Sequence, residues 1–221
     1  MNTQTRLVEV RTKILKKNDE KARALRQRFH THGVYVVSLV SSPGSGKTLF
    51  LEKVLKRLSS KFKVAALVGD LATENDATRL ARSGVPVRQI VTGTVCHLEA
   101  DMVENAIDGW DLDDLDVLLI ENVGNLVCPA TYDLGEDYRL VLFSVTEGED
   151  KPLKYPTIFN TADAAIITKT DLATAVEFRE DIALQSVHSV RPGLPVFKVS
   201  SKTESGLDEW ISALNTRYND S

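Results

Sequence analysis

The residues best suited to chemistry begin at SSPGSGKT, which directly follows the apolar run VYVVSLV. This segment fits the P-loop pattern G-x-x-x-x-G-K-[ST], except that Ser41 stands where the first glycine belongs. Gly44 and Gly46 allow tight backbone turns, so that successive N–H groups, including that of Ser45, can converge on phosphate oxygens. A strand before such a loop and a helix after it distinguish a phosphate site from an ordinary glycine-rich turn. The segment therefore predicts a nucleotide-binding site.

Four side chains are expected near the phosphates. Lys47 should reach the β- and γ-phosphates, and Thr48 should ligate Mg²⁺. Glu121 directly follows the apolar run DVLLI, where its carboxylate would hold Mg²⁺ or a water bound to it, and Asp70 directly follows the run KVAALVG. A lone carboxylate is more often a helix cap or a solvated charge. Ligands bind at the carboxyl ends of the strands in a doubly wound sheet, however, so we expect both carboxylates at the site.

The sequence TKTDL, after another apolar strand, predicts which base the site selects. Guanine-specific proteins place N-K-x-D here, and the Asp carboxylate accepts hydrogen bonds from guanine N1–H and the exocyclic amine. Adenine would leave the acceptor atoms of that carboxylate unpaired. Lys169 and Asp171 match this pattern, whereas Thr168 replaces the asparagine. Ser201 and Lys202, in SSK after the last strand, match a loop that closes over guanine O6, so the sequence favours GTP over ATP.

The only two cysteines of the chain offer a second kind of chemistry. Cys96 directly precedes His97, and Cys128 lies in ENVGNLVCP. If residues 97–108 form a helix, its dipole favours the Cys96 thiolate that binds metal, and Asp101 lies one turn after His97 as a hydrogen-bond partner or a further ligand. Such ligands suit Zn²⁺ or Ni²⁺, in an open site or in one completed by a second subunit. The alternative is two thiols used only for packing and a surface histidine.

These sites require parallel strands whose carboxyl ends lie at one edge of a sheet. Apolar, β-rich runs alternate with helical patterns through most of the 221 residues. The expected strands are residues 34–40, 63–69, 85–91, 116–120, 139–145, 162–168 and 194–200, and the expected helices are residues 47–59, 75–83, 97–108, 175–190 and 205–217. Such strands are typical of a parallel sheet covered on both faces. The sequence predicts an α/β fold with a doubly wound, mostly parallel P-loop domain.

The chain begins with a different pattern. Residues 4–30 place apolar residues at helical spacing among many lysines and arginines, which predicts an amphipathic helix that ends at Gly33. We expect an N-terminal helical extension at residues 1–32 and a P-loop domain at residues 33–221. The helix would either pack on its own domain or dock to a partner.

Composition excludes several classes of function. The net charge of −4 argues against non-specific binding to nucleic acid or to a membrane surface. No apolar run approaches the roughly 20 residues of a membrane-spanning helix, and the N-terminus has no apolar signal core. We therefore expect a cytoplasmic protein, in which two cysteines are poor candidates for a disulfide.

Together these motifs resemble the HypB family, the GTPases that help to deliver nickel during maturation of nickel–iron hydrogenase. The resemblance runs from about residue 34 to 215, and it rests on SSPGSGKT, GDLATENDATRL, TGTVCHLEADM, IENVGNLVCPATYDLGE, VTEGEDKPLKYP, TKTDL and SSKTESGL. The combination of CHL with NLVCP is specific, because the related urease nickel chaperones carry a Cys-Pro-His signature that is absent here. Ser41 in the P-loop is also usual in the family.

The resemblance implies a slow GTPase with Mg²⁺ as cofactor, in which Lys47 and Thr48 bind phosphate and Mg²⁺. Asp70 would belong to the switch that positions Mg²⁺ or the attacking water, and Glu121 would support Mg²⁺ through its water. Hydrolysis is then mostly positioning and charge stabilisation.

The resemblance also implies that Cys96, His97 and Cys128 hold Ni²⁺ or Zn²⁺ at a homodimer interface favoured by GTP, and that hydrolysis releases the metal. A HypA-type nickel chaperone and the hydrogenase large subunit would be partners. Two alternatives remain. The chain would be a GTPase of this class that serves urease or a cobalamin enzyme, or a non-catalytic metal carrier whose oligomeric state depends on nucleotide.

The chain departs from the family pattern at three places. Residues 1–32 contain no cysteine and only His30 and His32, so tight nickel binding and storage there are not expected. Asp101 stands where the family commonly has histidine, which affects the expected metal geometry. Thr168 in the base motif is expected to weaken guanine binding.

Overall fold

The computed structural model describes residues 3–70 and 79–220, with side chains from residue 12 onward, and it is built around one sheet of seven strands. The strands are β1 (Tyr35–Ser41), β2 (Val64–Asp70), β3 (Val87–Val91), β4 (Val117–Glu121), β5 (Tyr138–Ser144), β6 (Ala164–Thr168) and β7 (Val196–Val199). Their order is β3-β2-β4-β1-β5-β6-β7, and every pair of neighbours is parallel. The predicted doubly wound sheet is confirmed.

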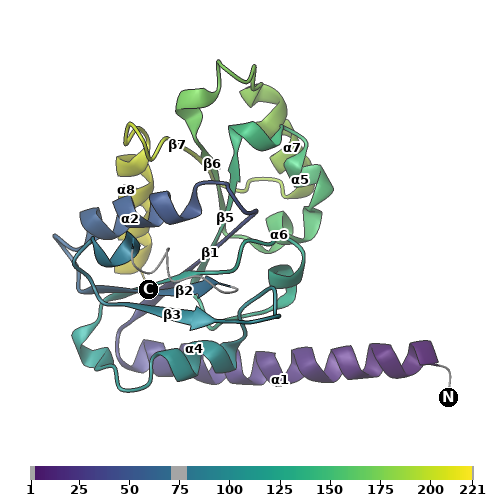
Figure 1. Cartoon of the computed structure of the whole chain (residues 1–221), viewed down its shortest axis with the longest axis vertical. Coiled ribbons are helices and arrows are strands. Elements are labelled where there is room, and N and C mark those ends of the chain that lie inside the picture. Colours follow the sequence, from purple (N-terminus) through teal and green to yellow (C-terminus); the bar gives the residue numbers. More distant parts are fainter. Residues whose placement is uncertain (1–2, 71–78, 221) are drawn as a thin grey trace.

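Helices cover both faces of this sheet (Figure 1). They are α1 (Thr3–Thr31), α2 (Lys47–Leu58), α4 (Ala100–Ala106), α5 (Lys151–Lys154), α6 (Pro156–Thr161), α7 (Glu180–Val190) and α8 (Leu207–Asn219), together with the 3-10 turns η1 (Leu112–Asp114), η2 (Cys128–Thr131), η3 (Val145–Glu147) and η4 (Thr170–Leu172). The helix predicted at 75–83 lies partly outside the described residues. Within the described part of that range, residues 79–81 are helical. The sequence did not predict α5 and α6, because these short helices, each with a proline in its first turn, leave no visible apolar period.

Alternate residues of the strands point to opposite faces and build two sides of the core. Leu39 of β1 packs in one cluster with Phe50 of α2 and Trp210 of α8. Val36 of β1 points the other way and packs in a second cluster with Phe29 of α1. All of β1 is buried, which explains why its sequence is apolar apart from Ser38 and Ser41.

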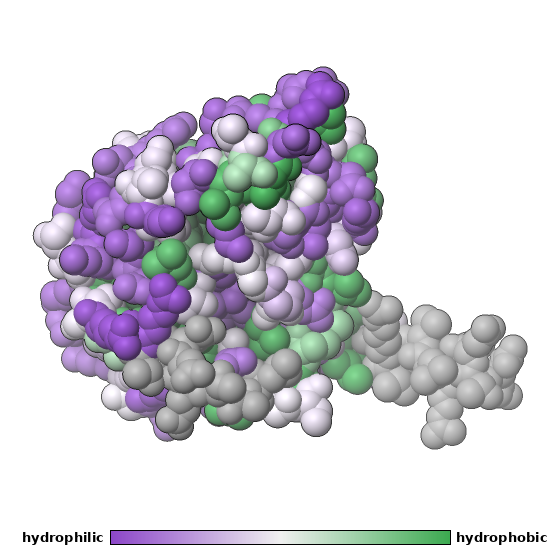
Figure 2. Space-filling view, turned by 45° about the horizontal axis from the view of Figure 1, so that its top comes forward, coloured by the Kyte–Doolittle hydropathy of each residue, from purple (hydrophilic) through white to green (hydrophobic). Residues whose placement is uncertain are grey.

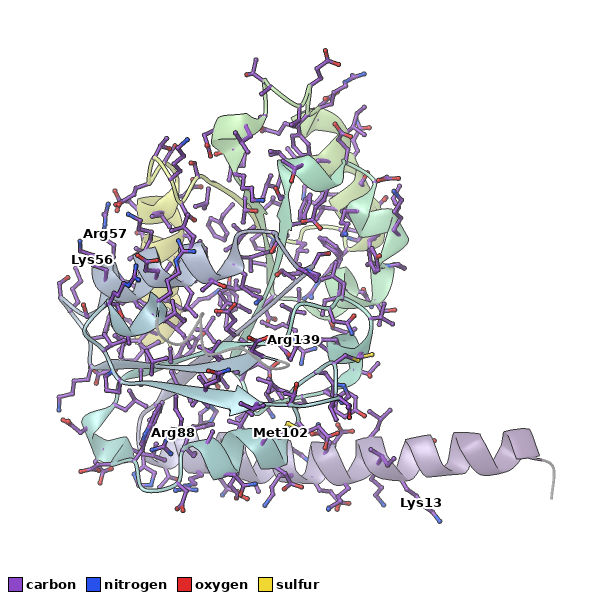
Figure 3. All side chains as sticks on the ribbon, viewed as in Figure 1. Lys13, Lys56, Arg57, Arg88, Met102 and Arg139 are labelled. Carbon is purple, nitrogen blue, oxygen red and sulfur yellow. The ribbon has the colours of Figure 1, made fainter. Side chains whose placement is uncertain are left out.

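The long helix α1 lies against the second face, beside α4. Ala22, Leu25 and Phe29 are fully buried there, and Gly33, with a φ of 70°, lies just past the end of the helix. Towards its N-terminus α1 extends beyond the body of the domain (Figure 1), and Lys13 points away from that body (Figure 3). The amphipathic character of the whole helix and the domain boundary at residue 32 stay predictions.

The surface agrees with the charged composition. Figure 2 shows a largely hydrophilic face on which hydrophobic residues form a few small groups. Within the described part of the chain, no helix is both long enough and apolar enough to cross a membrane.

Close backbone packing at Gly206, between β7 and α8, can be tested by comparing substitutions at Gly206 and at Gly109. Gly206 and Gly109 have similar φ angles of 78° and 75°, so alanine at either position incurs the left-handed backbone cost of about 1 kcal/mol. A Cβ at Gly206 would lie only 1.8 Å from Lys198 O, whereas one at Gly109 would meet nothing within 4 Å. We expect Gly206→Ala to lower the free energy of unfolding by about 3 kcal/mol or more in urea titrations, and Gly109→Ala by about 1 kcal/mol. Equal losses would contradict this account.

Candidate functional site

The P-loop lies where β1 ends and α2 begins. Gly44 and Gly46 have φ angles of 75° and 91°, and Gly46 directly precedes Lys47, the first residue of α2. Ser41 is fully buried at the position of the missing glycine, and its hydroxyl donates a hydrogen bond to Ser42 O at 2.9 Å. The serine therefore fits the loop, while the two left-handed turns are made by glycines.

Lys47, Thr48 and Glu121 meet at the base of this loop. Glu121 is 1% exposed, and its Oε1 accepts hydrogen bonds from Lys47 Nζ at 2.5 Å and from Thr48 Oγ1 at 2.9 Å. The parallel pairing of β1 with β4 places Leu39 opposite Glu121, which brings the carboxylate under the P-loop. Glu121 Oε2 is buried and accepts no hydrogen bond from the described residues. A buried oxygen of this kind fits a cation or a water bound to one.

A cavity of about 440 Å³ lies directly above these side chains. It is lined by the P-loop and by Gly69, Asp70, Arg79, Val123 and Gly124. Asp70 is the last residue of β2, so its carboxylate reaches the same edge of the sheet as Glu121. A Cβ at Gly124 would lie 3.1 Å from Pro43 N, so the chain after Glu121 packs closely on the P-loop.

The predicted base motif also touches the P-loop. Thr168 is 1% exposed, and its hydroxyl donates to Ser45 O at 2.5 Å. Lys169 has a left-handed φ of 57°, lies alongside Gly46 and donates from Nζ to Gly44 O at 2.6 Å. Thr168 stands at the position of the asparagine in the pattern, and its hydroxyl makes a direct hydrogen bond to the phosphate loop.

Asp171 lies in η4 and is held by a serine that the sequence analysis did not select. Ser200 Oγ donates to Asp171 Oδ1 at 2.6 Å, and it accepts from the Thr203 N–H at 3.2 Å. The predicted residues Ser201 and Lys202 follow in the same turn, Ser201 buried and Lys202 exposed. The loop after β7 therefore orients the carboxylate that is expected to read the base.

Glu204 ties this loop to the helix that follows the P-loop. Its carboxylate accepts hydrogen bonds from Lys53 at 2.8 Å and Arg57 at 2.6 Å, both on α2. These hydrogen bonds, first that of Lys53 and then that of Arg57, lower the pKa of Glu204 to about 2. The ion pairs therefore stay formed until the pH falls towards that value.

Cys96, His97 and Cys128 form a separate cluster. The two sulfur atoms lie 2.9 Å apart and are not joined by a disulfide. One ligand atom from each of the three residues lies within 4.8 Å of the others. All three residues are half-buried, and neither cysteine belongs to the hydrophobic clusters of the described residues. The arrangement supplies two thiols and an imidazole, which is a ligand set for Zn²⁺ or Ni²⁺ with an open fourth position.

The histidine ring supports this assignment. His97 Nδ1 and Nε2 are both buried without a hydrogen bond to any described residue, and Nε2 lies 3.4 Å from Glu99 Oε1. The ring packs against Tyr132, with 3.9 Å between ring centroids. Buried ring nitrogens that make no hydrogen bond need an explanation, and a metal bound to one of them would provide it.

The helix expected at 97–108 begins later than predicted. Glu99 precedes α4 with an extended backbone, and the helix starts only at Ala100. Cys96 therefore lies outside the first turn of α4, and its expected place at a helix N-terminus is wrong. Asp101 is not one turn beyond His97 on a shared helix. Its carboxylate faces Lys21 at 3.4 Å on α1, and it is not part of the cluster.

Two asparagines that the sequence analysis missed hold the segment around Cys96. Asn122 is 1% exposed, and its Oδ1 accepts from the Leu98 N–H at 3.1 Å. Asn125 donates from Nδ2 to Cys96 O at 3.3 Å and accepts at Oδ1 from the Val127 N–H at 2.8 Å. Asn122 directly follows Glu121 and Asn125 lies three residues further on, so one short segment connects the nucleotide site to the cysteine cluster. Polar residues amid the apolar run IENVGNLV were the available signal.

A parallel sheet that gathers a phosphate loop, a buried carboxylate and a base motif at one edge defines the class of P-loop nucleotide-binding proteins. Residues 35–198 match the family described as the CobW/HypB/UreG nucleotide-binding domain. With the relatives below, this match shows that the chain belongs to the HypB family.

Relatives and a solved structure agree over most of the chain. It is 44% identical over 210 residues to the hydrogenase maturation factor HypB of Azotobacter chroococcum, which covers 95% of this chain and 69% of that protein. It is 45% identical over 211 residues to the hydrogenase/urease maturation factor HypB of Helicobacter pylori, with 94% and 86% covered. The crystal structure of HypB from Helicobacter pylori in complex with nickel is similar with a TM-score of 0.88 and 44% identity, covering 92% of this chain and 96% of that one.

The contact of Thr168 with the P-loop predicts a measurable effect on nucleotide affinity. Thr168→Val keeps the shape of the side chain but leaves Ser45 O without the hydroxyl donor. Thr168→Ser keeps the donor. We expect the valine variant to bind GDP about tenfold more weakly in titration calorimetry, because a lost buried hydrogen bond costs about 1–3 kcal/mol. The serine variant should stay within about threefold of wild type. A serine variant as weak as the valine variant would show that packing, and not the hydrogen bond, positions the loop.

Proposed function

We propose that this chain is a metal-regulated GTPase that acts in nickel delivery during maturation of nickel–iron hydrogenase and dimerises when it binds GTP. The observation that carries the proposal is the cluster of Cys96, His97 and Cys128 beside a P-loop. Asn122 and Asn125 connect the two sites through hydrogen bonds. The similar HypB of Helicobacter pylori was solved with nickel, which supports metal binding by this cluster.

In this proposal the P-loop site hydrolyses GTP to GDP and phosphate. The N–H groups of Gly44, Ser45 and Gly46 bind phosphate oxygens, and Lys47 leaves Glu121 to reach the β- and γ-phosphates. Thr48 holds Mg²⁺, which supplies charge neutralisation when bound. Glu121 and Asp70 would help to hold the ion through hydrogen bonds to water and would orient the attacking water.

Guanine is selected by the motif around η4. Asp171 accepts from guanine N1–H and the exocyclic amine, held in place by Ser200. The Lys169 stem packs over the base plane, and the turn containing Ser201 and Lys202 closes over O6. Adenine would leave Asp171 unpaired, which is the source of the discrimination.

The metal site is proposed as Cys96, His97 and Cys128, with Ni²⁺ or Zn²⁺ as cargo. The fourth ligand would be water or a group from a second copy of the chain. Asp101 is not included, because its carboxylate faces Lys17 and Lys21.

The partners follow from the same assignment. A HypA-type nickel chaperone and the hydrogenase large subunit would exchange metal with this chain, without nucleic acid or membrane. A second client is also favoured, since the similar Helicobacter proteins are named hydrogenase/urease maturation factors. Deletion strains assayed for both nickel enzymes, with and without added nickel, would distinguish the clients.

Metal titration tests the proposal directly. Purified protein is titrated with Ni²⁺ and Zn²⁺ in GDP and in a non-hydrolysable GTP analogue, while metal content and mass are followed together. We expect about one metal ion per dimer with the GTP analogue, and loss of that metal in Cys96→Ala and Cys128→Ala with little change in stability. Metal binding that is absent, or the same with either nucleotide, would remove nickel delivery from the proposal and leave the nucleotide site intact.

A substitution at Lys47 distinguishes a GTP-hydrolysing enzyme from a non-catalytic metal carrier. Lys47→Ala removes the ammonium expected to stabilise charge on the transferring phosphoryl group, so hydrolysis should fall by at least about 100-fold, the scale of losing one such contact. The variant should fail to restore hydrogenase activity in a deletion strain. Full restoration by a variant without GTPase activity would establish the non-catalytic carrier instead.

A further inference from the structure

The helix α1 contacts both segments that carry the clustered cysteines. Asn18, on the face of α1 turned to the domain, is 7% exposed. Its Oδ1 accepts from the Ala100 N–H at 2.9 Å, and its Nδ2 donates to Asp133 O at 2.8 Å. Ala100 begins the helix that follows Cys96 and His97, and Asp133 follows the turn that begins at Cys128.

The chemistry of the amide makes this bridge specific. An asparagine side chain has one accepting end and one donating end, and the two partners here are a backbone donor and a backbone acceptor. Only one orientation of the amide therefore satisfies both contacts. Because the side chain is buried, water cannot easily replace either hydrogen bond, and losing the amide would leave two backbone groups unpaired.

Ion pairs on the same helix reinforce the bridge at both ends. Lys21 pairs with Glu104 and Asp101 on α4. Arg26 donates to Asp133 Oδ1 at 2.6 Å, on the other segment. Together these contacts fix α1 to each ligand segment, and the Asn18 side chain hydrogen-bonds the backbone of both.

The bridge has a counterpart inside the domain. Asn125 joins Cys96 O to the Val127 N–H, so it also spans the two ligand segments. Asn125 belongs to the chain that follows Glu121, whereas Asn18 belongs to the N-terminal helix. The ligand segments are therefore held together by two amides that come from different parts of the fold.

We propose that Asn18 is a positioning residue for the metal site, and that α1 is part of the metal-binding unit. The inference rests on the proposed metal function of Cys96, His97 and Cys128. Asn18 contacts no ligand atom. It acts by fixing the spacing of the two backbone segments from which the ligands project, so its loss should relax the geometry of the site and weaken the metal complex.

The test uses the full chain with three substitutions at one position. Asn18→Ala removes both hydrogen bonds. Asn18→Asp keeps the size and the acceptor for Ala100 but turns a carboxylate oxygen towards Asp133 O. Asn18→Ser is a milder truncation that keeps the measurement possible where the alanine variant does not fold. Ile211→Val is the stability control, because Ile211 is 9% exposed in the core cluster on the opposite face of the sheet.

Four properties are measured for each protein. They are the affinity for Ni²⁺ and Zn²⁺ by competition with a chromophoric chelator, the nickel–thiolate charge-transfer absorption, the melting temperature and the affinity for GDP. We expect the alanine and aspartate variants to bind metal about 10–100-fold more weakly, with an altered absorption band and unchanged GDP affinity. The Ile211→Val control should melt earlier and keep both its metal affinity and its absorption band.

The outcomes separate this inference from the proposed function. Wild-type protein that binds neither metal would refute the proposed metal site itself. Wild-type protein that binds metal, with Asn18 variants of equal affinity and identical absorption, would overturn the role of Asn18 alone. Metal affinity that falls with melting temperature in the same proportion for Ile211→Val and for the Asn18 variants would also overturn it.

Discussion

Both the nucleotide site and the cysteine cluster depend on how the buried carboxylate of Glu121 is held. A carboxylate at 1% exposure requires partners, and it has Lys47 and Thr48 from the first turn of α2. The parallel register of β1 and β4 makes this meeting unavoidable, since both strands end at the same edge. Any ligand that draws Lys47 away must leave Glu121 with a different partner. The position of the chain beyond Glu121 is therefore tied to what occupies the P-loop.

The segment after Glu121 is short, and its two asparagine side chains hydrogen-bond the backbone next to the clustered cysteines and histidine. Asn122 holds the Leu98 N–H, and Asn125 holds Cys96 O and the Val127 N–H. Between them, Gly124 lies against the P-loop at a distance that leaves no room for a side chain without movement. Hydrogen bonds of 2.8–3.3 Å therefore connect the chain beyond Glu121 to the segment around Cys96 and to the residue before Cys128. They provide a continuous set of contacts between the nucleotide site and the ligand segments.

The sequence predicted the sheet, the P-loop and the membership of the cluster, but not how the cluster is held. Strands buried on both faces can be recognised because most of their residues are apolar. Gly44, Gly46 and Lys47 can be recognised because the loop needs glycine at its two left-handed positions and a lysine directly after them. The start of α4 was misplaced because Asn122 captures the Leu98 N–H, a contact 24 residues away in sequence. Local propensity contains no information about that contact, and the same reason applies to Asp101, whose partners lie on α1.

The buried asparagines also explain how the side chains of the proposed metal site can converge although they lie on loops. Cys96, His97 and Cys128 all lie outside regular helices and strands, apart from the short turn η2. Loop ligands ordinarily lose conformational entropy when they converge on a metal, which weakens binding. Here the backbone on each side is already fixed by amides that would be costly to leave unpaired. The convergence of the three ligands therefore belongs to the folded chain itself, and metal binding does not have to bring the two segments together.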